Sequence, residues 1–522
     1  MLPRHARTFA VLVTAWAFAC GEAETPPEMT QLEEAASAET LAAEIDACDE
    51  LRIEALPEAA NLVLVVSDTT RRDRFGAYGG PADTPRFDAF AEAGLLFEDA
   101  SSNAPWTKPA MASLLTSRLP SGHGVVAHPR FGATADGRAE GLDPRALGRE
   151  DVLVEELETL PEAMRRAGLR TAAIVSNPWM AGAIGFDQGF DHFDDDAASW
   201  DAPSDAVTAA ALDWLAEVRE GERFFLYVHY MSAHMPYGPI DMDDVAALGG
   251  DADPHPLTPE AHTYLERLWS LGDETRPMPL RARSVRLIEV AYDRGLNAFD
   301  TELGALLDAL KARGDWSHTA VAVTSDHGEA LFERGIGGHG RSLHEDQLSI
   351  PLAVRLPGVA MPRSVGCPTS LIDLAPTFCG FLGVPCPTSF TGSNLLAPEI
   401  DTGLRSGFLV SEAVMNVEGH RSIRNARYKL IHRPGGPLRP DGTRDAALGA
   451  SRSDELYDVI VDPFERRDLL DGQPPVQMLD LRDRLRAALD ASTQLAPAPR
   501  RRSRVIDPQR RERLEALGYL HD

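Results

Sequence analysis

Two runs of apolar residues, far apart in the chain, each lead to side chains that can bind a metal ion. The β-branched run at 319–324 is followed closely by Asp326 and His327, and the run at 62–66 is followed by Asp68. Ligands in α/β proteins bind beyond the carboxyl ends of the strands. A carboxylate beside an imidazole suits Mg, Mn or Zn better than an all-oxygen calcium cage. We therefore expect one shared metal site; the alternatives are carboxylates that only cap a helix or bond backbone amides.

A candidate nucleophile lies between these two runs. Thr107 stands two residues before Pro109, and the segment AMASLL at 110–115 is typical of the start of a helix. A hydroxyl beside a helix N-terminus lies among unpaired backbone amides at the positive end of the helix dipole. Both favour an oxyanion and its phosphate or sulfate adduct. Thr107 is therefore a candidate nucleophile; the alternative is that it serves only as the N-cap.

The elements that must position these residues are those of an α/β protein. Continuous Val and Leu runs favour strands covered on both faces, as in a central, mostly parallel sheet between helices. The length of 522 residues and the 43% hydrophobic content fit a sizeable core and more than one domain. We expect a main α/β domain over 56–386 and a smaller C-terminal subdomain over 387–522.

The C-terminal subdomain is predicted to hold a small antiparallel sheet and a helix. The segments GFLVSEAV, HRSIRNARYKLIHR and SDELYDVIV indicate short strands with turns between them. The segment QMLDLRDRLRAALD indicates an amphipathic helix. Its leucines recur at roughly helical spacing, at positions Leu479, Leu481, Leu485 and Leu489.

Many segments, in the same order, resemble landmarks of the sulfatase family of the alkaline phosphatase superfamily. The similarity covers residues 61–520. Its segments include DTTRRDRFGAYGG, TPRFDAFAEAGLLFEDA, ASLLTSRLPSGHGV, LRTAAIVSNPWM, VHYMSAHMPYGP, SDHGE, GHGRSLHEDQLSIPLAVRLPG, SLIDLAPTFCGFLG and ELYDVIVDPFERRDL. The resemblance implies an alkaline phosphatase-like α/β fold and an enzyme that hydrolyses sulfuric or phosphoric esters.

The resemblance also implies roles for individual residues. Thr107 stands where sulfatases carry their nucleophile, and Asn177 stands where many of them have a lysine. His234 in the HxP segment and His339 before a glycine would bind the anionic oxygens of the substrate. Apart from the resemblance, Lys108 stands beside the nucleophile and either adds positive charge to the site or lies on an exposed loop. The residues implied to hold one divalent cation (Mn, Mg or Ca, with Zn as a further candidate) are Asp68, Thr107, Asp326 and His327.

The chain departs from the family pattern at the nucleophile. Sulfatases carry CxPSR or SxPSR, whereas this chain reads TKPAM from Thr107 to Met111. Because formylglycine is made only from Cys or Ser, we expect none here, and Met111 replaces the arginine that supports the aldehyde hydrate. A threonine hydroxyl activated by a metal can instead attack phosphorus, and water or an alcohol can then attack the phosphothreonine. Threonine is also the nucleophile of lipoteichoic acid synthases and related phosphotransferases, which this set of residues resembles, so phosphoesters are favoured.

Positions outside the proposed ligand set argue for a single cation. Thr69 stands where many sulfatases place a second metal-binding Asp, so we do not expect calcium coordination by the four family ligands. No motif supplies the further Asp and two His of a second metal site. Asp293 and Asp300 lie on a helix-like stretch, and we expect them to face solvent.

The amino terminus resembles an export signal. Two arginines and an apolar run precede Cys20, which is typical of a secretory signal and too short for a mature spanning helix. AFAC resembles a bacterial lipobox. We expect a signal peptide over 1–19, a lipidated Cys20 that anchors the protein to the membrane, and an acidic tether over 20–55. The protein would then be an exported cell-envelope lipoprotein, on the periplasmic side of the membrane or at the cell surface; the alternative is an ordinary cleaved signal ending near Ala19.

The net charge excludes one class of partner, and the cysteines leave the disulfide pairing open. The formal charge of −29 argues against nucleic acid. The basic run at 500–504 is interpreted as a solvated linker between surface helices. With Cys20 acylated, a bridge among Cys367, Cys379 and Cys386 stays open.

Three hypotheses follow. The first is a phosphoester hydrolase, or a phosphotransferase of phosphoglycerol or phosphoethanolamine type, that uses Thr107. The second is a true sulfatase that works without formylglycine. The third is a non-catalytic lipoprotein that binds anionic glycans, against which the retained metal and substrate-binding residues argue. In each case the partner is an anionic small molecule, lipid or glycan.

Overall fold

The computed structural model describes residues 61–127, 149–195, 204–235, 237–238, 282–334, 337–358, 363–396, 408–413, 415, 419–434, 453–494 and 498–516. The expected signal peptide over 1–19, Cys20 and the tether over 20–55 lie outside the described residues and stay predictions. The proposed domain boundary at 386 also stays a prediction. Within the described ranges, no helix combines the length and the apolar composition needed to cross a membrane.

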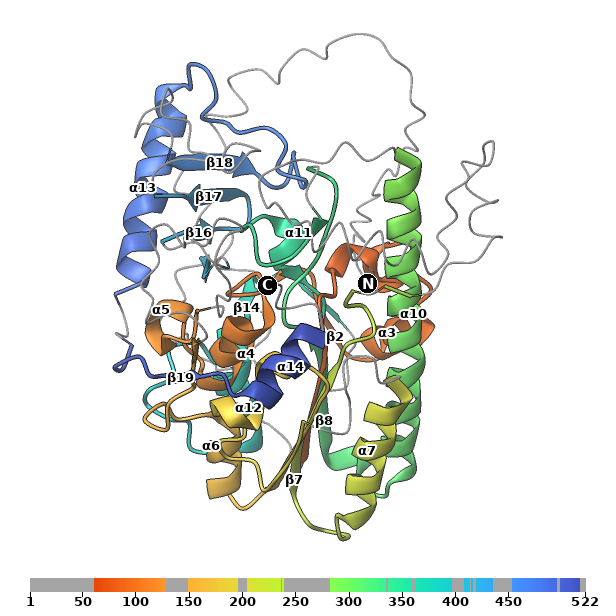
Figure 1. The fold of residues 1–522 in the computed structure, drawn as a ribbon. Helices are drawn as coiled ribbons and strands as arrows, with labels where there is room; N and C mark the ends of the chain where they lie inside the picture. The colour runs from red at the N-terminus through yellow and green to blue at the C-terminus, as the bar shows by residue number, and fades with distance from the viewer. Residues whose placement is uncertain are drawn as a thin grey trace, which may run out of the picture.

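An eight-stranded, mostly parallel sheet forms the centre of the fold (Figure 1). Across the sheet the strands are β13 (Arg363–Val365), β2 (Leu95–Phe97), β12 (Leu352–Arg355), β8 (Thr319–Ser325), β1 (Asn61–Ser67), β7 (Phe224–Tyr230), β5 (Arg170–Val175) and β6 (His192–Asp194). Strand β12 runs antiparallel to both of its neighbours, and the other neighbouring pairs are parallel. The predicted α/β fold class is confirmed.

The two strands that lead to the expected metal ligands are neighbours. β1 and β8 pair in parallel along their full length, and Ser67 lies opposite Ser325 at the end. Asp68 and Asp326 are the next residues, so both leave the sheet at the same edge. Every residue of both strands is buried, as their continuous apolar sequences predicted.

Helices cover both faces of the sheet. Because alternate side chains of a strand point to opposite faces, Leu62 and Leu64 lie in one core and Val63 and Val65 in the other. The first core includes residues of α4 (Thr107–Thr116), α6 (Leu160–Arg166) and α12 (Leu374–Leu382), and the second includes residues of α3 (Pro85–Glu92), α7 (Ser204–Glu217) and α10 (Ala282–Ala312). In Figure 1 the two groups stand on opposite sides of the sheet.

A second, four-stranded antiparallel sheet follows in the C-terminal part, as predicted. Its strands are β15 (Leu409–Glu412), β16 (Arg421–Arg424), β17 (Tyr428–His432) and β18 (Asp454–Asp458). Helix α13 (Val476–Ser492) packs on this sheet through Met478, Leu481, Leu485 and Leu489. Leu479 is only half-buried. Met478, rather than Leu479, lies on the face of the helix that packs on the sheet.

The last described segment returns to the large sheet's side of the molecule. β19 (Ser503–Val505) pairs antiparallel with β4 (Arg149–Asp151), and α14 (Pro508–Ala516) follows it. Arg501 and Arg502 form ion pairs with Asp151 and Glu156. The run at 500–504 lies between α13 and α14 and is largely exposed, as expected, but it is more than a linker, because part of it is a strand and its arginines meet acidic residues from far earlier in the chain.

Short elements complete the connections between these layers. They are β3 (Ala100–Ser101), β9 (Ala330–Leu331), β10 (Gly337–Gly338), β11 (Ser349–Ile350), β14 (Thr369–Ser370), α5 (Pro120–His123), α11 (Glu345–Leu348) and the 3-10 turns η1 (Arg72–Arg74), η2 (Gly76–Tyr78), η3 (Pro178–Met180), η4 (Gly182–Ile184), η5 (Trp316–His318) and η6 (Leu371–Asp373). Strands β11, β3 and β14 form a small sheet of their own.

Two further expectations are corrected by the fold. Asp293 and Asp300 do lie on a helix, α10, but they do not face solvent. Asp293 accepts from Arg74 Nε at 2.8 Å, and Asp300 is 3% exposed. A bridge among the three described cysteines is also wrong, since Cys379 and Cys386 are free thiols.

Candidate active site

Three neighbouring strands bring side chains to one point at the carboxyl edge of the large sheet. Asp68 follows β1, Asp326 follows β8, and His229 is the last residue but one of β7. The backbone N–H of Asp68 donates to the carbonyl of Tyr230 at 2.8 Å. This bond continues the pairing of β1 with β7 into the segment that carries the first carboxylate.

Each of the two carboxylates uses one oxygen within the protein and leaves the other without a hydrogen-bond partner among the described residues. Asp326 Oδ1 accepts from the backbone N–H of His327 at 2.8 Å. Asp68 Oδ2 accepts from His229 Nε2 at 3.0 Å and from Asn177 Nδ2. Asp68 Oδ1 and Asp326 Oδ2 have no donor, although both residues are fully buried. Buried anionic oxygens without donors are costly, so the arrangement fits a bound cation.

The His327 ring completes the donor set. Its Nδ1 donates to the carbonyl of Gly328 at 2.9 Å, which leaves the lone pair on Nε2 in the neutral ring. Nε2 lies 3.2 Å from Asp326 Oδ2 and 3.8 Å from Asp68 Oδ1. The three residues place one ligand atom each within 4.8 Å of one another. Burial alone would lower the pKa of His327, but the charges of Asp326 and Asp68 raise it to about 9, which shows how strongly the site attracts positive charge.

The side chain of Thr69, which stands where many sulfatases have a second metal-binding Asp, is used in a hydrogen bond to the backbone. Its backbone is in the left-handed region, with φ 56°, which is strained for a β-branched residue. Its Oγ1 donates back to the carbonyl of Asp68 at 2.7 Å, and its own carbonyl accepts from Tyr292 Oη at 2.7 Å. The side chain is thus engaged with the backbone.

Thr107 points its hydroxyl at this cluster. It is the first residue of α4 and is 2% exposed. Its Oγ1 lies 3.3 Å from Asp68 Oδ2, 3.4 Å from His327 Nε2 and 3.1 Å from Asn177 Nδ2. The alternative of a plain N-cap is wrong, because Trp106 is the N-cap residue and the Thr107 hydroxyl faces the carboxylates.

Asn177 holds the nucleophile and the first metal ligand together. It follows β5 and precedes η3. Its Oδ1 accepts from the backbone N–H of Trp179 at 2.8 Å, which orients the amide. The two hydrogens of Nδ2 are then directed to Asp68 Oδ2 and Thr107 Oγ1. The position was expected from the resemblance; the structure adds that its partners are a carboxylate and a hydroxyl.

Two more histidines lie beside the cluster, as the resemblance implied. The ring centres of His234 and His339 are 5.1 Å apart, and those of His339 and His327 are 4.5 Å apart. Burial lowers the pKa of His339 to about 3 and also lowers that of His234. Both rings are therefore neutral near pH 7, and each carries one N–H that can donate to an anionic oxygen.

Lys108 does not lie on an exposed loop. It is the second residue of α4 and is fully buried. Its Nζ lies 5.8 Å from the centre of the Trp179 ring and finds no hydrogen-bond partner in the described part of the chain. Burial lowers the pKa of Lys108 to about 8, and Glu150 and Asp151 on β4 partly oppose this. The loop expectation failed because β4 approaches α4 from a distant part of the chain; a role of Lys108 in substrate binding stays a prediction.

Two residues of the site were missed in the sequence. His229 stands inside the run FFLYVHY, and Glu329 ends SDHGE. Glu329 Oε2 lies 3.1 Å from His339 Nδ1, and burial raises the pKa of Glu329 to about 8. Burial alone would also raise the pKa of Asp68, but the hydrogen bond from His229 and nearby imidazoles hold it well below its ordinary value. A polar residue near the carboxyl end of a buried strand was the signal that could have identified His229.

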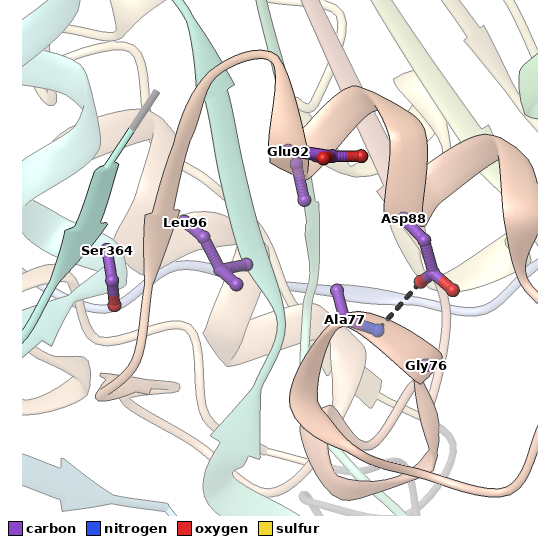
Figure 2. Close-up of a pocket in the computed structure, with 7 residues that line it drawn as sticks. Gly76, Ala77, Asp88, Glu92, Leu96 and Ser364 are labelled. Carbon is purple, nitrogen blue, oxygen red and sulfur yellow. Dashed lines mark hydrogen bonds between the residues drawn. The ribbon is translucent and has the colours of Figure 1, made fainter. Parts of the chain in front are cut away.

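A separate pocket of about 430 Å³ lies between α3, η2, β2 and β13 (Figure 2). Asp88 lines it, and its Oδ1 already accepts from the backbone N–H of Ala77 at 2.8 Å. Glu92 and Ser364 also line it. None of the residues around Asp68 and Thr107 takes part in it, so we assign it no chemistry.

Comparison with known proteins supports the resemblance seen in the sequence. The sulfatase family model matches residues 60–384. The chain is 26% identical over 469 residues to the uncharacterized sulfatase YidJ of Escherichia coli (strain K12), covering 82% of this chain and 86% of that protein. It is 22% identical over 463 residues to N-acetylglucosamine-6-O-sulfatase of Bacteroides thetaiotaomicron, covering 71% and 78%.

A solved structure with the same fold is the phosphonate monoester hydrolase of Agrobacterium radiobacter. It superposes with a TM-score of 0.60 at 19% identity, covering 83% of this chain and 96% of that one. Together with the family match over more than half of the chain, this establishes both fold and family. The chain belongs to the sulfatase family of the alkaline phosphatase superfamily, whose members hydrolyse sulfuric or phosphoric esters.

Proposed function

We propose that this protein is a metal-dependent hydrolase of sulfuric or phosphoric esters that prefers phosphoesters and works through a covalent Thr107 intermediate. The observation that carries the proposal is the position of Thr107 Oγ1. It is buried at the start of a helix, 3.1 Å from the Asn177 amide and 3.3 Å from Asp68 Oδ2. A hydroxyl so placed is poised for attack, and the helix N-terminus favours the anionic adduct.

Asp68, Asp326 and His327 would hold one divalent cation, with the Thr107 hydroxyl as a further ligand. Two carboxylate oxygens and one imidazole nitrogen favour Mn, Mg or Zn over an all-oxygen calcium cage, although Ca stays a candidate. A bound cation would lower the pKa of the Thr107 hydroxyl and neutralise charge on the transferring group. No formylglycine is needed for this chemistry.

The protein's own residues account for the other steps. The bond between Thr107 Oγ1 and phosphorus forms as the ester P–O bond breaks. His234 and His339 donate to the free oxygens of the phosphoryl group, and the proton that the Thr107 hydroxyl loses passes through water to the departing alcohol. Attack of water on the phosphothreonine releases phosphate. Attack of a second alcohol instead would make the protein a phosphotransferase.

The substrate is an anionic ester of a small molecule, lipid or glycan. The N-acetylglucosamine-6-O-sulfatase relative supports a sulfated sugar, and the phosphonate monoester hydrolase neighbour supports a phosphorus centre. Thr107 favours the second, because a threonine cannot become the aldehyde hydrate that expels sulfate. The signal-like N-terminus supports export to the cell envelope and anchoring through a lipidated Cys20.

The test is a panel of aryl substrates: a phosphate monoester, a phosphate diester, a phosphonate and a sulfate. Each is assayed with added Mn, Mg, Ca or Zn. We expect phosphoester turnover to exceed sulfate turnover, and Thr107→Ala to lower kcat by about a thousandfold or more. An acid quench during turnover should leave one phosphoryl group on the peptide that contains Thr107, detected by mass spectrometry.

Thr116→Ala is the matched control. This residue is buried in the same helix, and its hydroxyl donates to the carbonyl of Ala112. The control variant should keep its activity and its labelled peptide. Preferred sulfate turnover, or full activity in Thr107→Ala, would rule out the proposal. Activity that is absent with all four metals would favour an anionic-glycan-binding protein.

A further inference from the structure

We propose that His229 is a positioning residue that fixes the Asp68 carboxylate for cation binding, and that Tyr227 selects the tautomer of His229 that does so. The inference rests on the proposed cation site. It adds residues that act on a ligand of the cation rather than on the cation or the substrate.

The register of the sheet brings these side chains together. β7 pairs in parallel with β1, and His229 lies opposite Val66, two residues before Asp68. His229 Nε2 lies 3.0 Å from Asp68 Oδ2. Tyr227 is two residues earlier, on the same face of β7, and its Oη lies 2.8 Å from His229 Nδ1. All three side chains are fully buried.

The direction of each hydrogen bond follows from the groups involved. An ionised carboxylate only accepts, so His229 Nε2 must carry the proton that is shared with Asp68. In the neutral ring, Nδ1 then has the lone pair and accepts from Tyr227 Oη. That hydroxyl also lies 3.2 Å from the sulfur atoms of Met111 and Met180, but a thioether is a weak acceptor. The chain of donation therefore runs from Tyr227 to His229 to Asp68.

This chain fixes the rotation of the Asp68 carboxylate. Oδ2 accepts from His229 and from Asn177, whereas no described residue donates to Oδ1. With Oδ2 held by two donors, Oδ1 is the oxygen that lies 3.8 Å from His327 Nε2. A metal ligand held in this way loses little freedom when the cation binds, and groups that orient ligands commonly contribute ten- to hundredfold in affinity.

His229 and Asn177 have separable roles. The Asn177 amide is shared between Asp68 and the nucleophile Thr107. Among the described residues, His229 contacts the carboxylate and Tyr227, but it makes no hydrogen bond to Thr107. Changing His229 should therefore weaken cation binding more than it slows the reaction once the site is saturated with metal.

The experiment is calorimetric titration of Mn²⁺ into the chelator-stripped full chain. We expect His229→Ala to raise the Kd about ten- to hundredfold. His229→Gln should recover most of the affinity, since its amide nitrogen can stand where Nε2 stands. Tyr227→Phe should raise the Kd by a smaller factor and add nothing in the His229→Ala background. At saturating Mn²⁺ the kcat of each variant should fall less than its affinity.

The control is His192→Ala, an exposed histidine on β6 of the same sheet, which should bind Mn²⁺ like the unmodified protein. A Kd of His229→Ala within twofold of the unmodified value, or a His229→Gln protein as weak as His229→Ala, would overturn the inference. Thr107→Ala should still bind Mn²⁺ and still respond to His229→Ala. A protein without esterase activity that follows this pattern therefore refutes the proposed function and leaves the inference standing.

Discussion

Two buried carboxylate oxygens that lack donors dominate the site at the scale of single residues. Asp68 Oδ1 and Asp326 Oδ2 lie 3.8 and 3.2 Å from His327 Nε2. Like charges in a poorly solvated environment repel, and each loses its hydration without replacement. The folded chain therefore carries a local cost that a bound cation removes.

Asp326→Asn tests this cost directly. In the unmodified protein, Mn²⁺ at a hundred times its Kd should raise the free energy of unfolding by about 2.7 kcal/mol. The variant should lose this gain. Stripped of metal, it lacks the charge that faces the His327 ring at 3.2 Å and raises the pKa of that ring, so it should be no more stable than the stripped unmodified protein. Urea unfolding with and without Mn²⁺ measures both effects.

Asp308→Asn is the control for that comparison, since Asp308 is 52% exposed on α10. It should keep the full response to Mn²⁺. An Asp326→Asn protein that responds to Mn²⁺ like the unmodified chain would show that the cation binds elsewhere.

The residues that could be predicted from the sequence are those at the ends of elements. Asp68 and Asp326 follow apolar runs, and Thr107 begins a helix, so position in the sequence indicated position in the site. His229 lies within a strand, and its role depends on which strand is its neighbour. Lys108 was placed on a loop because nothing local to it indicates that β4 and Trp179 cover it.

At the scale of elements too, features set by the local sequence could be predicted, and features set by remote contacts could not. The apolar runs predicted β1 and β8, and a helix was expected around Asp300. The direction of the Asp300 side chain was wrong because its partners are remote. Its carboxylate accepts from the backbone N–H groups of Arg86 and Phe87 in the first turn of α3, at 2.9 and 2.7 Å. A helix start 214 residues earlier decides that orientation.

His123 joins two elements and makes their packing sensitive to pH. It ends α5, its Nδ1 accepts from the backbone N–H of Val125 at 3.0 Å, and its Nε2 lies 3.0 Å from Ser113 Oγ on α4. Burial lowers the pKa of His123 from 6.5 to about 3. As the pH falls through about 6.5, the unfolded chain gains the proton first, so stability present above that pH is lost progressively down to about pH 3.

The expected loss from His123 between pH 7 and pH 5 is about 2 kcal/mol in the free energy of unfolding. His123→Asn should lack this part of the pH dependence, because the amide oxygen can still accept from Val125 but does not titrate. Urea unfolding at both pH values measures the difference. The exposed His192, changed to Asn, should leave the dependence unaltered; an unchanged dependence in His123→Asn would contradict the assignment.

At the scale of the whole molecule, the C-terminal helix α14 contacts the segment that orients the nucleophile. Arg510 on α14 forms a two-point ion pair with Glu150 on β4, at 2.6 and 2.8 Å. Its Nη1 also donates to the carbonyl of Pro178 at 3.1 Å. Pro178 directly follows Asn177, so the C-terminal end of the described chain contacts the segment whose amide donates to Thr107.

Arg510→Met should therefore have two separable effects. It leaves Glu150, which is fully buried, as an unpaired charge, and breaking such a pair costs about 3–5 kcal/mol. Replacing both residues by Met removes the charge and should restore most of the stability. The double variant still lacks the donor to Pro178, so the Asn177 amide should be less well placed. Its kcat/KM should stay below that of the unmodified protein.

Urea unfolding and steady-state kinetics on the same proteins distinguish the two effects. Arg502→Met is the control, because its pair with Glu156 is exposed, at 63% and 52%, and such pairs contribute little. A double variant with full activity would mean that the segment contributes stability alone. A double variant as unstable as Arg510→Met would mean that the donation to Pro178, rather than the charge of Glu150, makes the larger contribution to holding α14 against the large sheet.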